Sequence, residues 1–323
     1  MDESKNDIYC ITDENYINKC KAYINIMLSS QQWSGITKAD VERWISNFEV
    51  EEESDERCII YKILSKLIYF SEKDIENLLR DVVNNRIFLD KVLAAQIKSE
   101  FNLSEKALSN IVNSEIRESC FVPLLDSDSP HESGNYVSRL LVQKEIISTR
   151  QSFFLSKLVD RMAQDGYRRI IIVDDCIGSG QQIDSFWNST ATVTIDGKDI
   201  LLKDWANQNG IEVIYLALFG YEENVSALKT SLNGLKIYCA KELSSRLRVL
   251  NKDSYMWDNE KEYEMAFAFL KRVTGERGIE LYGYRGLDFA FIMHQTIPDW
   301  SLPLFWRETP DWSCLLRRKN SNV

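Results

Sequence analysis

Histidine and patterned cysteine are scarce in this chain, and each scarcity excludes a kind of site. Only two of its 323 residues are histidines, His131 and His294, which leaves little material for a histidine metal site or a Ser-His-Asp arrangement. The 7 cysteines are scattered, without a CxxC pair or a close Cys/His pairing. Neither a disulfide framework nor a structural zinc site is therefore indicated, and a reducing compartment fits best.

Long apolar runs and an excess of positive charge are also lacking. No run approaches the ~18 apolar residues of a membrane span, and the polar start MDESKND has no signal-peptide stretch. We expect a soluble, cytoplasmic protein with no membrane contact. Lys and Arg number 39 against 49 Asp and Glu, a net charge of -10, so broad coating of nucleic acid is disfavoured. The hydrophobic share of 44% is enough for a sizeable core.

Residues 15–119 are nearly free of Gly and Pro, and apolar residues recur there at three- and four-residue spacing. This pattern predicts an all-helical N-terminal region, residues 1–118, with short helices after Thr37, Ser71 and Ser104. The helix at 37–47 is a candidate for the recognition helix of a helix-turn-helix. Its charges are mixed, however, so a helical cap or a partner-binding platform is the favoured alternative.

From residue 119 to 323, short apolar runs alternate with helical patterns, which predicts an α/β fold with a parallel sheet flanked by helices. We expect strands at 120–125, 168–174, 212–219, 235–239 and 288–293. We expect helices at about 135–149, 151–164, 221–231 and 260–274, and an inserted hairpin at 190–202.

The most informative stretch is RRIIIVDDCIGSGQQ, residues 168–182. A buried strand stops at Asp174 and Asp175, which places two carboxylates at the carboxyl edge of a parallel sheet, where open α/β folds bind ligands. The Gly-Ser-Gly turn that follows lets a ligand approach the backbone, and a helix starting near Gln181 would direct free N–H groups at an anion. The segment predicts an anion cradle beside a carboxylate pair that binds a sugar or a metal. An acid pair that only caps the next helix is the alternative.

Two further segments are candidates for ligand contact. The loop 126–134 follows a predicted strand and precedes a helix, a position that suits a second anion-binding element with Ser133, Gly134 and Arg139 as its contacts. An ordinary capped helix start explains it equally well, and His131 is more simply a loop histidine than a base. In 281–306, Tyr284 with Trp300 and Trp306 could form a wall on which a base stacks, although core packing is the commoner fate of such residues.

The stretch 170–182 resembles the 5-phosphoribosyl-1-pyrophosphate (PRPP) loop of type I phosphoribosyltransferases, with four apolar residues, two acids, two variable residues and a Gly-Ser-Gly turn in order. The resemblance implies that Asp174 and Asp175 contact the ribose hydroxyls, that Mg²⁺ accompanies PRPP near these two acids, and that the loop 126–134 holds the pyrophosphate. It also implies that five residues wrap the 5-phosphate: Gly178, Ser179, Gly180, Gln181 and Gln182. The two glutamines depart from the small residue and Thr usual there, which puts affinity in doubt more than fold.

The order PHESG, IIIVDDCIGSGQQ and HQTIPDWSLPLFW behind a helical region is similar to phosphoribosyltransferase-like effectors of bacterial antiphage loci, some of them encoded beside retron reverse transcriptases. The resemblance implies a toxic effector that partners hold inactive, among them a reverse transcriptase and its nucleic acid. It would act on Mg-PRPP or a related phosphorylated ribose or nucleotide at the anomeric carbon, and an oligomer is compatible with this. A module that senses PRPP or a nucleotide without consuming it, or that binds DNA or a partner, is the alternative.

Overall fold

The computed structural model describes residues 14–51, 54–125, 133–294 and 296–318, and it divides into two compact units. One unit is continuous and comprises Lys73–Ser244, whereas the other joins Met1–Glu72 to Ser245–Val323. This division differs from the boundary expected after residue 118. Helices of the N-terminal half contribute to both units, because those beyond residue 72 pack with the sheet while those before it share a core with the C-terminal segment.

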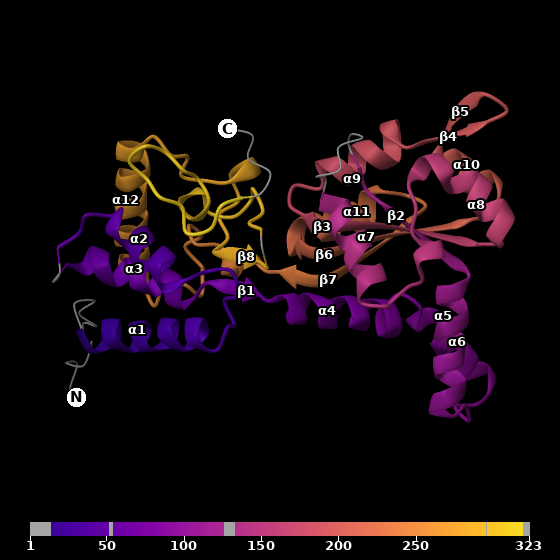
Figure 1. The fold of residues 1–323 in the computed structure, drawn as a ribbon, viewed down its shortest axis with the longest axis horizontal. Coiled ribbons are helices and arrows are strands. Elements are labelled where there is room, and N and C mark those ends of the chain that lie inside the picture. Colours follow the sequence, from indigo (N-terminus) through magenta and orange to yellow (C-terminus); the bar gives the residue numbers. More distant parts are fainter. Residues whose placement is uncertain (1–13, 52–53, 126–132, 295, 319–323) are drawn as a thin grey trace, which may run out of the picture. The chain divides into compact units, whose positions relative to one another are not determined.

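The continuous unit is built on a parallel sheet of four strands in the order β2-β3-β6-β7 (Figure 1). The strands are β2 (Ser119–Pro123), β3 (Arg169–Ile177), β6 (Glu212–Tyr221) and β7 (Leu235–Leu243). The side chains of residues 170–173 in β3 are all fully buried. Since neighbours along a strand point to opposite faces, both faces of the sheet are covered, which is why these strands read as unbroken apolar runs.

Helices α8 to α11 cover one face of this sheet. They share a core with alternate strand residues such as Ile170, Ile172 and Tyr215. Their bounds are α8 (Leu158–Asp165), α9 (Gln181–Ser185), α10 (Leu202–Gln208) and α11 (Glu222–Ser231). Helix α7 (Ser133–Gln143) adds no residue to that core and packs against β2 and β3. The α/β fold with a parallel sheet flanked by helices is confirmed, as is the expected hairpin, β4 (Thr192–Ile195) with β5 (Lys198–Leu201).

Helices α4 (Glu72–Asp81), α5 (Leu89–Lys98) and α6 (Glu105–Arg117) precede the sheet, with a π-helical turn at Val82–Arg86. Ser104 begins α6 as expected, because its side chain accepts a hydrogen bond from the Ala107 backbone N–H. Arg86 donates to the backbone oxygens of Cys239 and Ala240 in β7. This contact ties the helical segment to the sheet.

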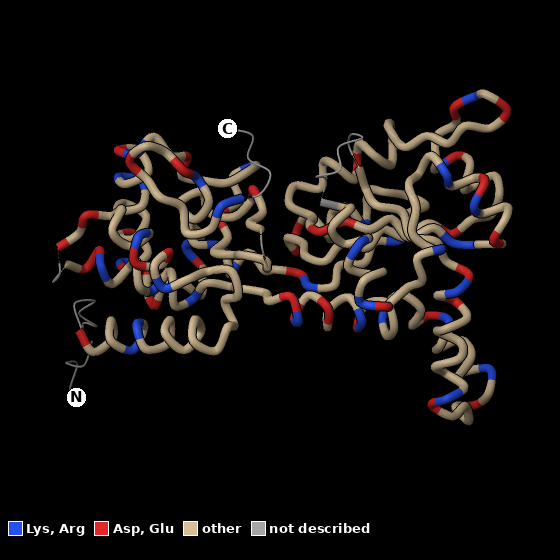
Figure 2. Tube along the Cα trace, viewed as in Figure 1, with Lys and Arg blue, Asp and Glu red and all other residues tan. Residues whose placement is uncertain are grey.

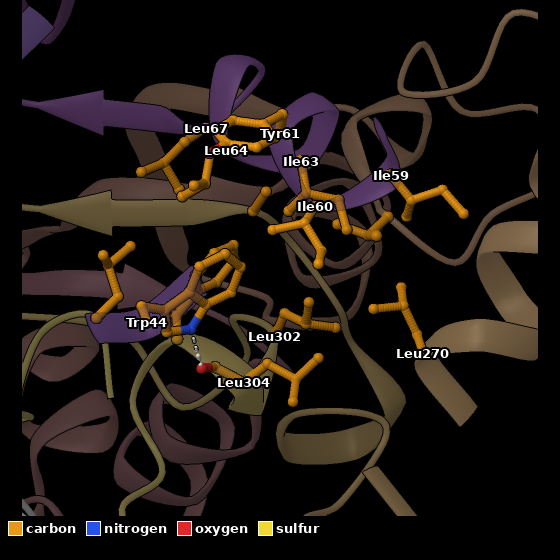
Figure 3. Close-up of a cluster of buried hydrophobic side chains, with 14 of the residues drawn as sticks. Trp44, Ile59, Ile60, Tyr61, Ile63, Leu64, Leu67, Leu270, Leu302 and Leu304 are labelled. Carbon is orange, nitrogen blue, oxygen red and sulfur yellow. Dashed lines mark hydrogen bonds between the residues drawn. The ribbon is translucent and has the colours of Figure 1, made fainter. Parts of the chain in front are cut away.

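The other unit packs α1 (Glu14–Ser29), α2 (Lys38–Ser46) and α3 (Asp55–Ser65) with α12 (Glu260–Arg277) and the C-terminal segment. Figure 3 shows the centre of its core, where the Trp44 indole N–H donates to the Leu304 backbone oxygen over 2.6 Å. Trp312 donates to the same oxygen over 3.0 Å. Two buried indoles thus satisfy one carbonyl and fix the C-terminal segment against α2.

Helix α2 is the expected helix after Thr37, and a capping box between Thr37 and Asp40 begins it. Its basic side chains are paired within the helix, Lys38 with Glu42 and Arg43 with Asp40. Figure 2 shows the same mixture of blue and red residues along the part of the chain that the structure describes. Paired charges of this kind do not present a basic face to DNA phosphates.

The strand expected at 288–293 is only partly present, because β8 spans Phe291–Met293 and lies outside the main sheet. It pairs in parallel with β1 (Ile68–Phe70), a strand within the region expected to be all-helical. Both expectations were wrong at this point, because two segments that are remote in sequence pair to form a separate two-stranded sheet.

Among the helices that the structure describes, none has the length and the apolar character of a membrane span.

Arg169 anchors the start of β3 to its surroundings. Only 7% exposed, it donates to Glu212 of β6 and over 2.7 Å to Glu115 of α6. Its guanidinium also lies over the Phe88 ring. Burial alone would raise the pKa of Glu212, but hydrogen bonds from Lys236 and Arg169 outweigh it and hold the pKa below the ordinary 4.5.

We predict that Glu212→Gln lowers the free energy of unfolding at pH 7 by about 2 kcal/mol, the scale of a hydrogen bond to a charged group. A carboxyl whose folded pKa is depressed stabilises the fold above its unfolded pKa and loses that contribution as pH falls through the folded value. The difference between the wild type and the variant should therefore shrink as pH falls below 4.5. Urea unfolding across this range measures it, and a difference that persists in acid would contradict the linkage.

Candidate functional site

The end of β3 places two acids in different surroundings. Asp174 is 1% exposed and accepts two hydrogen bonds, at Oδ2 from the Tyr215 hydroxyl over 2.9 Å and at Oδ1 from the Asp175 backbone N–H over 2.9 Å. Burial, and next the negative charge of Asp174, raise the pKa of Tyr215 well above 10.0. The phenol therefore stays protonated and remains a donor to Asp174.

Asp175 points to the opposite face of the strand, because successive residues of a strand alternate. It is partly exposed, unlike its neighbour. The two acids therefore differ: Asp174 is buried and hydrogen-bonded within the fold, whereas Asp175 is partly exposed at the end of the strand.

Two residues of helix α11 contact the turn that follows β3. Asn224 donates from Nδ2 to the Gly178 backbone oxygen over 2.7 Å, and the Ser179 hydroxyl accepts from the Gln181 backbone N–H over 3.3 Å. Gly180 has a φ of 77°, in the left-handed region, and a side chain there would meet Leu228 at 2.7 Å. The helix expected near Gln181 is present as α9, with Gln181 exposed and Gln182 partly exposed.

Helix α7 brings a second predicted element to the same edge. It begins at Ser133, and a Cβ on Gly134 would lie 2.3 Å from the Leu124 backbone oxygen. Leu124 in turn donates from its backbone N–H to Val173, the residue before Asp174. The structure thus places Gly134 against the segment that pairs with β3 at Val173, and glycine is required for this close approach of helix to strand. Arg139 lies further along α7 and is exposed, whereas His131 lies outside the described residues.

The expected contact of Tyr284 with a ligand stays a prediction. Tyr284 belongs to the unit that contains both chain termini, is 47% exposed and donates from its backbone N–H to Asp299. Trp300 and Trp306 are buried at 2% and 8% exposure. The packing alternative applies to these two tryptophans, because the Trp300 ring packs against Phe291 and Trp306 belongs to the hydrophobic core of this unit.

The acid pair is a limited site for a metal. No group of three or more His, Cys, Asp or Glu side chains suited to a metal ion occurs among the residues that the structure describes. Both Asp174 oxygens already accept hydrogen bonds within the fold, whereas Asp175 is partly exposed. Because Mg²⁺ commonly takes only one or two protein carboxylates and fills its shell with water and substrate oxygens, the site fits an ion that arrives with a phosphorylated ligand.

Sequence reasoning missed Tyr215 and Asn224, which support the site from other elements. Tyr215 stands two residues before Ala217, the partner of Asp174 in the parallel register. A tyrosine within an apolar strand is a usable signal, since a buried phenol needs a hydrogen-bond partner. Asn224 gives no such signal, because its partner is a backbone oxygen 46 positions away.

We predict that Gly134→Ala destabilises the fold by about 1–3 kcal/mol, because the added methyl meets backbone that cannot rotate away. Gly275→Ala in α12 is the matched control. Nothing lies within 4 Å of its added Cβ, so it should be neutral or stabilising by up to about 1 kcal/mol. Thermal and urea unfolding of both variants measure this, and a Gly134→Ala protein as stable as the control would refute the close contact.

Comparison with known proteins agrees with this geometry. No curated protein matches the chain significantly. The model of the family PRTase-CE matches residues 41–318, which is most of the chain and includes both the β3 turn and α7. The protein therefore belongs to the PRTase-CE family and is phosphoribosyltransferase-like.

Proposed function

We propose that the chain binds Mg-PRPP, or a related phosphorylated ribose or nucleotide, at the β3–α9 turn and acts at the anomeric carbon. One observation carries the proposal: Asp175, a partly exposed acid, lies in the last residues of β3, and a glycine turn follows the strand at the carboxyl edge of a parallel sheet. Ligands of open α/β folds bind at this edge. The family match supports the phosphoribosyl class of ligand.

The proposed chemistry breaks the bond from ribose C1 to pyrophosphate while an acceptor or water forms a new bond at C1. Positive charge develops on the ribose in such a step, so holding the ribose and the leaving group in place is the main contribution of the protein. Asp175 would accept hydrogen bonds from the ribose hydroxyls, and the backbone around Ser179 and Gly180 would surround the 5-phosphate. Mg²⁺ would supply positive charge to the pyrophosphate.

A sensor that binds the same ligand without turnover is the second candidate. It is favoured by the way Asp174 is used, since both its oxygens accept hydrogen bonds within the fold and Asp175 is the partly exposed acid of the pair. Ribose binding needs only that carboxylate and the phosphate turn. Release of pyrophosphate during binding separates an enzyme from a sensor.

We predict that Asp175→Asn raises the Kd for Mg-PRPP at least tenfold, because it removes charged acceptors worth about 1.5–3 kcal/mol per hydrogen bond. Asp184→Asn is the matched control, since Asp184 is an exposed acid of the neighbouring α9. Isothermal titration of the wild type and both variants, followed by a pyrophosphate assay, provides the measurement. Equal loss in both variants, or none in either, would remove Asp175 from the site.

The proposal extends to a toxic effector of phage defence that partners hold inactive, among them a reverse transcriptase and its nucleic acid. We predict that production of the chain without partners slows bacterial growth, and that Asp175→Asn removes this effect while Asp184→Asn does not. Growth curves at matched protein levels measure it. Unimpaired growth with the wild-type chain, or equal toxicity of the Asp175 variant, would contradict the effector role.

A further inference from the structure

The unit that contains both termini brings His294 against a serine and an acid from distant parts of the sequence. Its Nδ1 lies 3.1 Å from the Ser34 hydroxyl, and its Nε2 lies 3.7 Å from Glu72 Oε2. Ser34 comes from the turn after α1, Glu72 from the residues after β1, and His294 directly follows β8. The pairing of β1 with β8 creates this meeting, because Phe70 accepts a hydrogen bond from the His294 backbone N–H over 2.8 Å.

The two distances suit one state of the imidazole. With the proton on Nε2, the ring faces the Glu72 carboxylate, and Nδ1 is free to accept the Ser34 hydroxyl proton. A hydroxyl, a base within hydrogen-bond reach and a group that orients the base are the parts of an activated nucleophile.

The turn around Ser34 is held in place by Tyr69 and is partly exposed to solvent. The Tyr69 hydroxyl donates to the Ser34 backbone oxygen and lies 3.4 Å from the Ser34 hydroxyl. Burial raises the pKa of Tyr69, so this phenol stays protonated. Ser34 is partly exposed and the following Gly35 is exposed.

Gly35 has a φ of 107°, and over the described part of the chain its backbone N–H has no hydrogen-bond partner. A free N–H on the residue after a nucleophile is one way to stabilise the oxyanion of acyl transfer.

We propose that Ser34 is the nucleophile of a second, esterase-type site, with His294 as its base and Glu72 as the residue that orients the base. The ligand class is a small ester without negative charge, because the Glu72 carboxylate would repel an anion. The site involves no residue of the β3 turn, so it stands independently of the proposed phosphoribosyl function.

The reaction needs only the ester and water. The Ser34 oxygen bonds to the ester carbonyl carbon while its proton passes to His294 Nδ1, and the Gly35 N–H faces the new oxyanion. The C–O bond to the alcohol then breaks, and the alcohol leaves with that proton. Water repeats the two steps on the acyl-serine, which releases the acid and restores the Ser34 hydroxyl.

The experiment is covalent labelling of the full chain with a fluorophosphonate, which bonds to an activated serine with loss of fluoride. Peptide mass spectrometry should place one label on Ser34, and the native chain should react at least tenfold faster than the urea-unfolded chain. Ser34→Ala should lose the label. Ser30→Ala is the matched control and should keep it, since the Ser30 hydroxyl donates to the Ile26 backbone oxygen in the same turn region.

Variants of the other two residues test their roles. His294→Gln should slow labelling about 100-fold, the lower range of general-base catalysis. Glu72→Gln should slow it up to about fivefold, and about 1 M salt should slow the wild type to the same rate, because a partly exposed charge pair is weak and is screened. A merely structural Glu72 would not produce this salt dependence.

Melting temperatures of all variants show whether each is folded. If Ser34→Ala is unfolded, Ser34→Cys replaces it, and its thiol should react with iodoacetamide faster than in the double variant with His294→Gln. Hydrolysis of p-nitrophenyl acetate should follow the same order as labelling. Native labelling no faster than that of the unfolded chain, labels spread over other serines, or an unchanged rate in folded His294→Gln would each overturn the proposal.

Discussion

The candidate site depends on satisfying a carboxylate that is buried at the end of a central strand. Asp174 can occupy that place only because the Tyr215 hydroxyl and the Asp175 backbone N–H both donate to it, since a buried charge without partners is strongly unfavourable. The tyrosine comes from β6, so the requirement also fixes the register of two strands. With that strand end fixed, the glycine turn and Asp175 hold a constant position relative to the sheet.

Much of the fold follows from local pattern. The apolar run 170–173 predicted a strand buried on both faces, and Thr37 and Ser104 predicted helix starts, because each depends on residues close together in sequence. The pairing of β1 with β8 was not predictable in this way. Each strand has only three residues, too short for a periodic signal, and they are joined by hydrogen bonds between segments more than 200 positions apart.

The sequence also predicted only part of the candidate site. The sequence pointed to the pair Asp174 and Asp175, but it could not assign them separate roles, since that depends on which face of the strand carries Tyr215. Gly134 was expected as an anion contact, and the structure gives it a packing reason against Leu124. Tyr284 was grouped with the site by its aromatic neighbours, whereas the chain places it in the other unit.

The two units also differ in whether one continuous part of the sequence forms them. Lys73–Ser244 is a continuous segment, whereas its companion needs residues from both sides of that segment. Because a chain emerges from the ribosome N-terminus first and domains fold as units, the sheet and its glycine turn can form while synthesis is still under way. The apolar faces of α1 to α3 must wait for α12 and the C-terminal segment that share their core. The newly made protein thus completes the sheet and its glycine turn before the helical core that surrounds Trp44.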